Sequence, residues 1–123
     1  MNDDLFEVGI YAEYYNRILD IDLPILKIVQ SKGLKIHIQK RHPNVIGYLP
    51  NIPDIITEPD YIGTNPKEPN SIELVKIYQD NIKLAIKLDI DNDYYFVASL
   101  YDITKSKLDK HIESGRLKKY LTK

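Results

Sequence analysis

The clearest pattern of apolar and polar positions lies in the second half of the chain. Every second residue in 82–90 is apolar, with lysine, alanine and aspartate between them, which predicts a strand with one apolar face. The segments 71–78 and 94–103 are rich in β-branched and aromatic residues and also predict strands. With turns near Asn81 and at 91–93, these strands form an antiparallel meander.

The alternation also predicts how the last two strands pair. With a loop at 91–93, Leu88 faces Phe96 and Leu84 faces Leu100, which makes one continuous apolar face. The opposite face then carries Lys83, Lys87, Tyr95, Ser99 and Tyr101. A small residue between the two lysines leaves room there for a ligand, although an ordinary solvent-exposed sheet face has the same pattern.

The first half of the chain has weaker patterns. Alternation in 6–10 suggests a strand, and residues 18–29 suggest a strand or a short helix. Residues 31–42 alternate like a strand, but Ser31 is also a suitable N-cap for a helix that ends at Pro43. The pattern alone leaves both interpretations of this segment open.

Prolines and caps organise the remaining segments. The proline-rich stretch that follows residue 42 predicts short helical turns at 45–49 and 52–57. Near the end of the chain, Thr104 caps a predicted helix that runs toward Tyr120. No linker or internal repeat divides the sequence, so we expect one domain over 1–123.

Composition narrows the class of protein. The chain has 123 residues, of which 43% are hydrophobic, and both values are typical of one globular domain. It contains no cysteine, which excludes disulfides and thiol chemistry. The sequence shows neither a long apolar run nor a secretion signal, so we expect a soluble, cytoplasmic protein that does not interact with membranes.

The net charge of −1 results from segments of opposite sign. Residues 27–42 carry five bases and no acid, and 105–123 carry seven bases and two acids, whereas 1–26 and 43–104 are acidic. A local positive surface attracts an anion whatever the total charge is. The charge therefore does not exclude a nucleic-acid partner, although lysine-rich helices often are simply solvated.

The densest chemistry lies in 37–43, which reads His-Ile-Gln-Lys-Arg-His-Pro. Its two imidazoles can exchange protons near neutral pH, and its two cations can stabilise a charged phosphate. Metal-free RNA cleavage requires such a set, with a base for the ribose 2′-OH, a cation and an acid for the leaving oxygen. The same residues would also complement the dipole at a helix C-terminus. On a helix the two histidines would point about 140° apart, which argues against a shared metal ion.

The order of motifs resembles that of a known family. The histidine motif is followed by Ile-Pro-Asp-Ile-Ile-Thr-Glu-Pro-Asp-Tyr-Ile at 52–62, and then by the meander and the closing helix. Over about residues 30–120 this resembles the phage-associated nuclease-like domains of the barnase, EndoU, colicin and RelE group. The resemblance implies an α+β fold in which N-terminal helices pack on a four-stranded antiparallel sheet, with a C-terminal helix. It divides the domain into a nuclease-like core, 30–121, and an N-terminal extension, 1–29, with no assigned role.

The resemblance also implies catalytic residues and favours the helical interpretation of the histidine motif. His37 matches the helix histidine, which acts as acid or base, and His42 could serve in its place. Arg41 matches one of two basic residues that contact phosphate. The hydroxyl of a late strand corresponds to Ser99 or Tyr101.

Further residues are expected to bind substrate. Lys40 matches the second basic residue of the motif, and the strand register alone adds Lys83, Lys87 and Tyr95. Together these features predict a metal-independent RNA endonuclease of phage or toxin type, with no cofactor. RNA is the expected partner, and a cognate inhibitor or immunity protein is a second one. The alternatives are a non-catalytic RNA- or protein-binding module on the same scaffold, or a phage-derived accessory or immunity protein.

Overall fold

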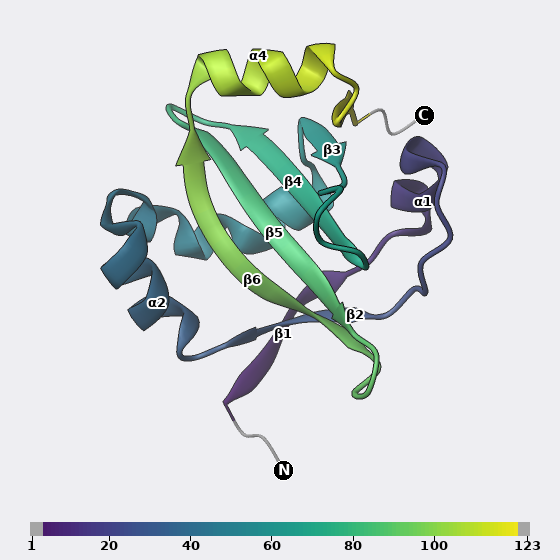
Figure 1. Ribbon diagram of the computed structural model, residues 1–123. Helices are drawn as coiled ribbons and strands as arrows, with labels where there is room; N and C mark the ends of the chain where they lie inside the picture. Colours follow the sequence, from purple (N-terminus) through teal and green to yellow (C-terminus); the bar gives the residue numbers. More distant parts are fainter. Residues whose placement is uncertain (1–3, 121–123) are drawn as a thin grey trace.

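The computed structural model describes residues 4–120, which form an α+β fold around one mixed, seven-stranded sheet (Figure 1). The strands are β1 (Leu5–Ile10), β2 (Lys27–Ser31), β3 (Tyr61–Gly63), β4 (Ser71–Ile77), β5 (Asn81–Asp89), β6 (Tyr94–Ile103) and β7 (Leu117–Lys119). The helices are α1 (Glu13–Leu19), α2 (Leu34–Arg41), the 3₁₀ helix η1 (Pro43–Asn51), α3 (Ile52–Thr57) and α4 (Lys105–Glu113). Within residues 4–120, no helix has the length and apolar character needed to cross a membrane.

The expectation of a four-stranded antiparallel sheet with N-terminal helices is wrong. The strand order is β1-β2-β6-β5-β4-β3-β7, and β2 runs parallel to β6 whereas its other neighbour, β1, is antiparallel. The chain also begins with a strand, since β1 precedes α1. The physical reason is burial: Ile28 and Val29 of β2 are 0% and 4% exposed, and they become so by pairing with the edge of β6.

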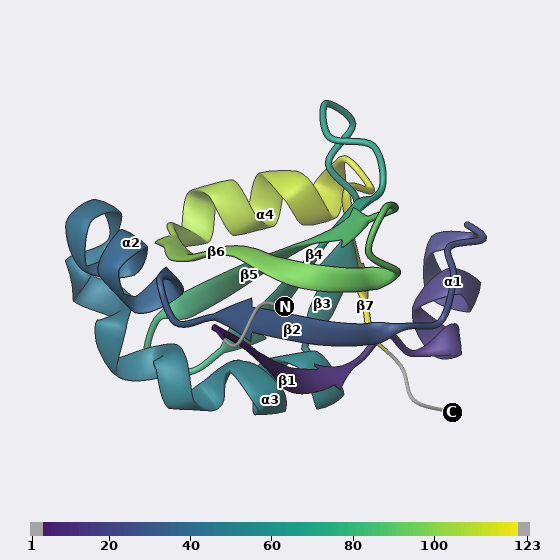
Figure 2. The ribbon, with the colours of Figure 1, turned by 90° about the horizontal axis from the view of Figure 1, so that it is seen from below.

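Helices cover both sides of the sheet. Figure 2 shows α4 on one side of β4, β5 and β6, and α3 on the other. On the α3 side, the inner face, the even-numbered residues Ile82, Leu84 and Ile86 of β5 are fully buried in the main core. On the α4 side, the outer face, a smaller cluster joins Leu108 of α4 to residues of β4, β6 and β7. The predicted apolar face of β5 is therefore part of the core face of the molecule over Ile82, Leu84 and Ile86.

The segment with two open interpretations is helical. Leu34 and Ile38 of α2 are buried, whereas Ile36 between them is 60% exposed. Buried residues four positions apart fit the period of a helix, whereas in a strand Ile36 would lie on the same face as Leu34 and Ile38. The helix ends at Arg41, two residues before Pro43, as expected. Ser31 belongs to β2 and does not cap the helix.

The predicted register of β5 and β6 is right in one half and wrong in the other. Ala85 pairs with Ser99, as predicted, but an irregularity at Ala98 shifts the pairing toward the turn by one residue. Phe96 therefore lies opposite Lys87 and not opposite the next residue of β5. A β-bulge inserts one residue on one strand and exchanges the faces beyond it. Phe96 consequently lies on the outer face, where Tyr95 was expected.

The C-terminal helix is shorter than predicted. Thr104 caps α4 as expected, because its Oγ1 accepts a hydrogen bond from the backbone N–H of Lys107 at 3.1 Å. The helix ends at Glu113, and Gly115 adopts a φ of 83°, which reverses the chain. The following residues form β7 against β3 and do not continue the helix to Tyr120. This reversal is what brings the chain from α4 back to the edge of the sheet beside β3.

Candidate functional site

The outer face of the sheet is only partly covered. Helix α4 crosses one end of β4, β5 and β6 (Figure 1), where Leu108 packs near Val75 and Ile103. Away from that end, the outward residues of β5 and β6 meet solvent, and Ser99 beside Ala85 is half-buried. The uncovered part of this face is bordered by the polar face of α2, because α2 packs along β6. It is the part of the sheet where charged and aromatic side chains accumulate.

A buried set of ion pairs lies at the margin between the covered and uncovered parts. Glu73 of β4 accepts hydrogen bonds from Nε and Nη2 of Arg116 at 3.0 and 2.8 Å, a bidentate pair. Its carboxylate also lies 2.8 Å from Nζ of Lys83. Burial opposes ionisation of Glu73, but the hydrogen bonds from Arg116 and Lys83 outweigh it and hold the pKa below the usual value. Glu73 is therefore ionised at neutral pH and holds both cations in place.

Tyr101 connects these ion pairs to the end of α2. Nζ of Lys83 lies 5.6 Å from the centre of the Tyr101 ring, and the His42 ring stacks on Tyr101 with the ring centres 5.3 Å apart. Burial and the nearby charge of Glu73 raise the pKa of Tyr101, so its hydroxyl stays protonated and can donate a hydrogen bond. We call these five residues, His42, Glu73, Lys83, Tyr101 and Arg116, the charged cluster.

A second imidazole lies beside the charged cluster. The Nδ1 atom of His111 in α4 is buried and has no hydrogen-bond partner among the residues that the structure describes. Burial lowers the pKa of His111, and the positive charges of Arg116 and Lys83 lower it further. A neutral imidazole with one free nitrogen can accept a proton, which makes His111 a candidate acid–base group.

Sequence reasoning missed Glu73, Arg116 and His111. A signal for Glu73 was present, since extending the meander across the turn near Asn81 places it opposite Ala85, on the same face as Lys83. Arg116 and His111 had no comparable signal. Their positions depend on how α4 crosses the sheet and on the chain reversal that follows it.

The other predicted residues of the histidine motif lie along α2. His37, Lys40 and Arg41 are exposed. His37 lines a hollow of about 400 Å³ together with Phe96 and Lys87, so we call it the histidine hollow. The structure thus separates the two histidines of the motif: His42 joins the charged cluster, and His37 borders the neighbouring hollow.

Three predicted binding residues differ in access. Lys87 pairs with Glu68 at 3.0 Å at the surface. Because its side chain is 37% exposed, its ammonium group can also reach an anion there. Lys83 is 1% exposed and is already paired. Tyr95 is also 1% exposed, stacks on Tyr11 at 4.6 Å and donates a hydrogen bond from its hydroxyl to the backbone oxygen of Pro24 at 2.6 Å. Lys83 and Tyr95 are therefore buried inside the protein and offer no surface to a substrate.

The arrangement combines the groups needed for acid–base chemistry on a phosphate. The His42 ring stacks on Tyr101, the Glu73 carboxylate orients Arg116, and the charges of Arg116 and Lys83 act on His111. Among residues 4–120, no group of three or more histidine, aspartate or glutamate side chains is placed to hold a metal ion. Proton transfer and charge stabilisation are what this set of side chains can supply.

Comparison with known protein families gives a match over most of the chain. A family model described as phage-Barnase-EndoU-ColicinE5/D-RelE like nuclease 3 matches residues 6–110. No curated protein and no solved structure matches the chain. The matched range contains His42, Glu73, Lys83 and Tyr101, and it begins in β1, well before the segment 30–120 that carries the order of motifs.

Proposed function

The chain belongs to this family of phage-associated, nuclease-like domains, which confirms the resemblance drawn from its motif order, and we propose that it cleaves RNA without a metal ion, by general acid–base transesterification. Membership supports a nuclease activity as such. The choice of RNA and of this mechanism rests on one observation: the continuous contacts that join His42, through Tyr101, to the ion pairs of Glu73.

The proposed reaction needs three roles. A base removes the proton of a ribose 2′-OH, and the 2′ oxygen attacks the adjacent phosphorus. The bond from phosphorus to the 5′ oxygen breaks, and an acid supplies the proton that this oxygen takes up. The products are a 2′,3′-cyclic phosphate and a free 5′-OH, so no water, oxidant or metal ion enters the cleavage step.

The charged cluster offers candidates for each role. His42 is half-buried at the open end of the cluster, so its imidazole can meet a ribose and exchange a proton with it. Arg116 is 26% exposed and oriented by its bidentate pair with Glu73, which suits it to bind the charged phosphorane. His111 is the candidate for the second proton transfer. Lys83 acts as a positioning residue, because it is buried against Glu73 and touches no solvent.

The surrounding surface would hold the rest of the RNA chain. His37, Lys40 and Arg41 present donors along the exposed side of α2, and Lys87 extends this set across β5. The hydroxyl of Ser99 lies between these residues and Tyr101 on the open part of the face. These groups would bind phosphate and ribose oxygens, which fix the position of RNA without reading its sequence.

The test is cleavage of a single-stranded RNA in excess chelator. We expect the unmodified protein to release a 2′,3′-cyclic phosphate, and a 2′-deoxy nucleotide at the cleaved position to block the reaction. The His42→Phe variant keeps a ring on Tyr101 but has no ionisable nitrogen, so its kcat should fall by about 10²–10⁴. His42→Ala should fall as far, and His37→Ala should fall less, because His37 lies in the neighbouring hollow.

Lys118→Ala is a matched control, because this lysine is exposed on β7 and lies outside the charged cluster. The control should cleave as the unmodified protein does. If RNA stays intact while its binding weakens steeply with salt, the protein is a binding module and the proposal fails. Cleavage that requires a divalent cation would refute the mechanism but keep the nuclease activity.

A further inference from the structure

The uncovered face continues past the charged cluster into an aromatic region that the proposed reaction does not use. We propose that this region is a nucleobase subsite, which restricts the protein to single-stranded RNA. The inference rests on the proposed function, since it identifies the form of RNA that the same face receives. Its central residues are Tyr94 and Phe96 of β6, both half-buried on the outer face.

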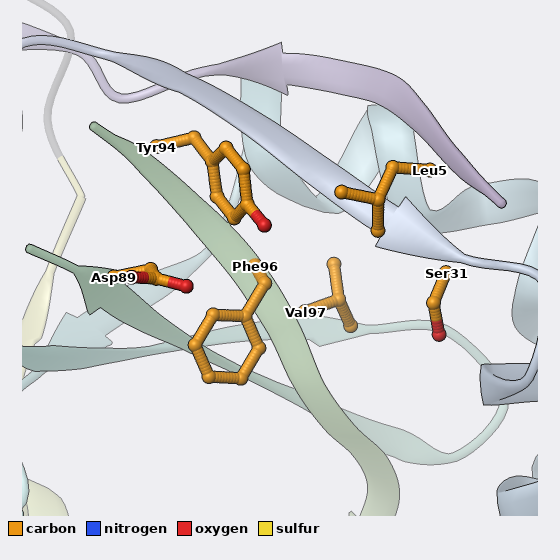
Figure 3. Close-up of a pocket in the computed structure, with 6 residues that line it drawn as sticks. All are labelled: Leu5, Ser31, Asp89, Tyr94, Phe96 and Val97. Atoms are coloured by element: carbon orange, nitrogen blue, oxygen red, sulfur yellow. The ribbon is translucent and has the colours of Figure 1, made fainter. Parts of the chain in front are cut away.

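The subsite is a second hollow, of about 220 Å³, which we call the aromatic hollow. It is lined by Leu5, Ser31, Asp89, Tyr94, Phe96 and Val97, which Figure 3 shows around it. Its wall is shared with the histidine hollow, because Ser31, Phe96 and Val97 line both. A ligand can therefore extend from one hollow to the other without leaving the protein surface.

The size and the lining suit one planar base. Pockets for whole drug-sized ligands have about 300–1,000 Å³, so the aromatic hollow is too small for a complete larger ligand. Phe96 and Tyr94 offer ring surfaces on which a base can stack, and every base has a suitable face. The irregularity at Ala98 is what turns Phe96 outward, and thus places an aromatic ring where a half-buried sheet face meets solvent.

Charge decides which part of a nucleotide occupies which hollow. Asp89 lies at the aromatic hollow and repels a phosphate, whereas Lys87 and His37 lie at the histidine hollow and attract one. Asp89 is oriented by Asn92, whose backbone and side-chain nitrogens donate to it at 3.2 and 2.9 Å. A carboxylate has about four acceptor positions, so Asp89 can still accept hydrogen bonds from an amino group of a base.

The need for a free, unstacked base explains the restriction to single strands. In a duplex, each base is stacked on its neighbours and paired, so it cannot enter a hollow beside a strand of the protein. In single-stranded RNA the bases can turn outward and stack on aromatic side chains. With the base at Asp89 and its phosphate at Lys87, the RNA chain would continue toward the charged cluster along β6.

Binding and cleavage are measured separately, so that failure of the subsite and failure of the proposed function can be distinguished. The binding probe is a short single-stranded RNA that contains 2-aminopurine and 2′-deoxy nucleotides, which prevent cleavage. We expect stacking on Phe96 to quench its fluorescence. Phe96→Leu should weaken binding about tenfold, since stacking on one aromatic side chain contributes about 1–3 kcal/mol per base. Phe96→Tyr should restore it, because the ring remains.

The matched control is Tyr48→Leu, which removes a half-buried ring that packs on Tyr78 beside the main core. It should bind as the unmodified protein does. Equal binding by Phe96→Leu and the unmodified protein would overturn the subsite, as would cleavage of a matched duplex at the same rate as the single strand. Quenching by a protein that leaves RNA intact would support the subsite and refute the proposed function. Cleavage without quenching would support the proposed function and refute the subsite.

Discussion

Removing the charge of Glu73 should destabilise the protein more than removing the charge of its buried partner Lys83. The side chains of Glu73 and Lys83 are 4% and 1% exposed, whereas that of Arg116 is 26% exposed. Glu73→Gln therefore leaves the Lys83 ammonium buried without a counter-charge, while Arg116 can turn toward water. Lys83→Met has a milder consequence, because Glu73 keeps its bidentate pair with Arg116 and the methionine fills the space of the lysine stem.

The expected magnitudes follow from this difference. Removing one partner of a buried pair costs about 3–5 kcal/mol when the other charge stays buried, and we expect this loss for Glu73→Gln. For Lys83→Met we expect about 1–2 kcal/mol, because the loss of a charge-assisted hydrogen bond is offset by the removal of a desolvated cation. The double variant Glu73→Gln/Lys83→Met should be more stable than Glu73→Gln alone, since it buries no unpaired ammonium.

Urea unfolding at neutral pH measures these differences as shifts of the midpoint at constant slope. The reasoning would be refuted if Lys83→Met were as destabilising as Glu73→Gln, or if the double variant were the least stable of the three. The pH dependence is a second check. Because the pKa of Glu73 is below its ordinary value of 4.5, its contribution is complete above that value and is lost as the pH falls through the folded-state pKa. The difference in free energy of unfolding between the unmodified protein and Glu73→Gln should therefore narrow as the pH falls below 4.5 and through the folded-state pKa.

Two further predictions test the geometry behind the site. In Gly63→Ala, the new Cβ would lie 2.0 Å from the backbone oxygen of Arg116, so we expect a loss of about 2–3 kcal/mol and weaker RNA cleavage. Gly47→Ala is the control, with no atom within 4 Å of its Cβ, and equal urea midpoints for the two variants would contradict the packing. Tyr95→Phe removes the hydroxyl bonded to Pro24 and should lower the free energy of unfolding by about 1 kcal/mol. RNA cleavage by this variant should be unchanged, and a fall in kcat/KM without unfolding would show that Tyr95 contacts substrate after all.

Sequence alone predicted the elements whose pattern is local. The strands over 71–78, 82–90 and 94–103 and the turns at 45–49 and 52–57 all correspond to observed elements. Apolar side chains recur at a period set by the backbone, so this information is contained in a few neighbouring residues. The helix of the histidine motif was different, because its alternating pattern also fitted a strand. Only the burial of Leu34 and Ile38, with Ile36 exposed, distinguishes the two.

The register shows where local patterns stop being informative. Opposite Ala85 and Leu84 the prediction was right, because any other pairing there would expose apolar residues. Nearer the turn, Tyr95 and Phe96 are both aromatic, and the prediction that Phe96 lies on the apolar face and Tyr95 on the opposite face was wrong. The stack of Tyr95 on Tyr11 decides which of the two faces the core, and Tyr11 comes from a distant part of the chain.

For the candidate site, the sequence by itself determined the chemistry of the histidine motif and the family, and it placed Lys83 and Tyr101 on one face of the meander. The tertiary structure decided which of these groups lie close together. His42 meets Tyr101 because α2 packs along β6, and Arg116 reaches Glu73 because the chain reverses after α4. Such contacts join residues far apart in the sequence. They depend on how several buried surfaces pack together, and the local periodicity of the sequence does not determine this packing.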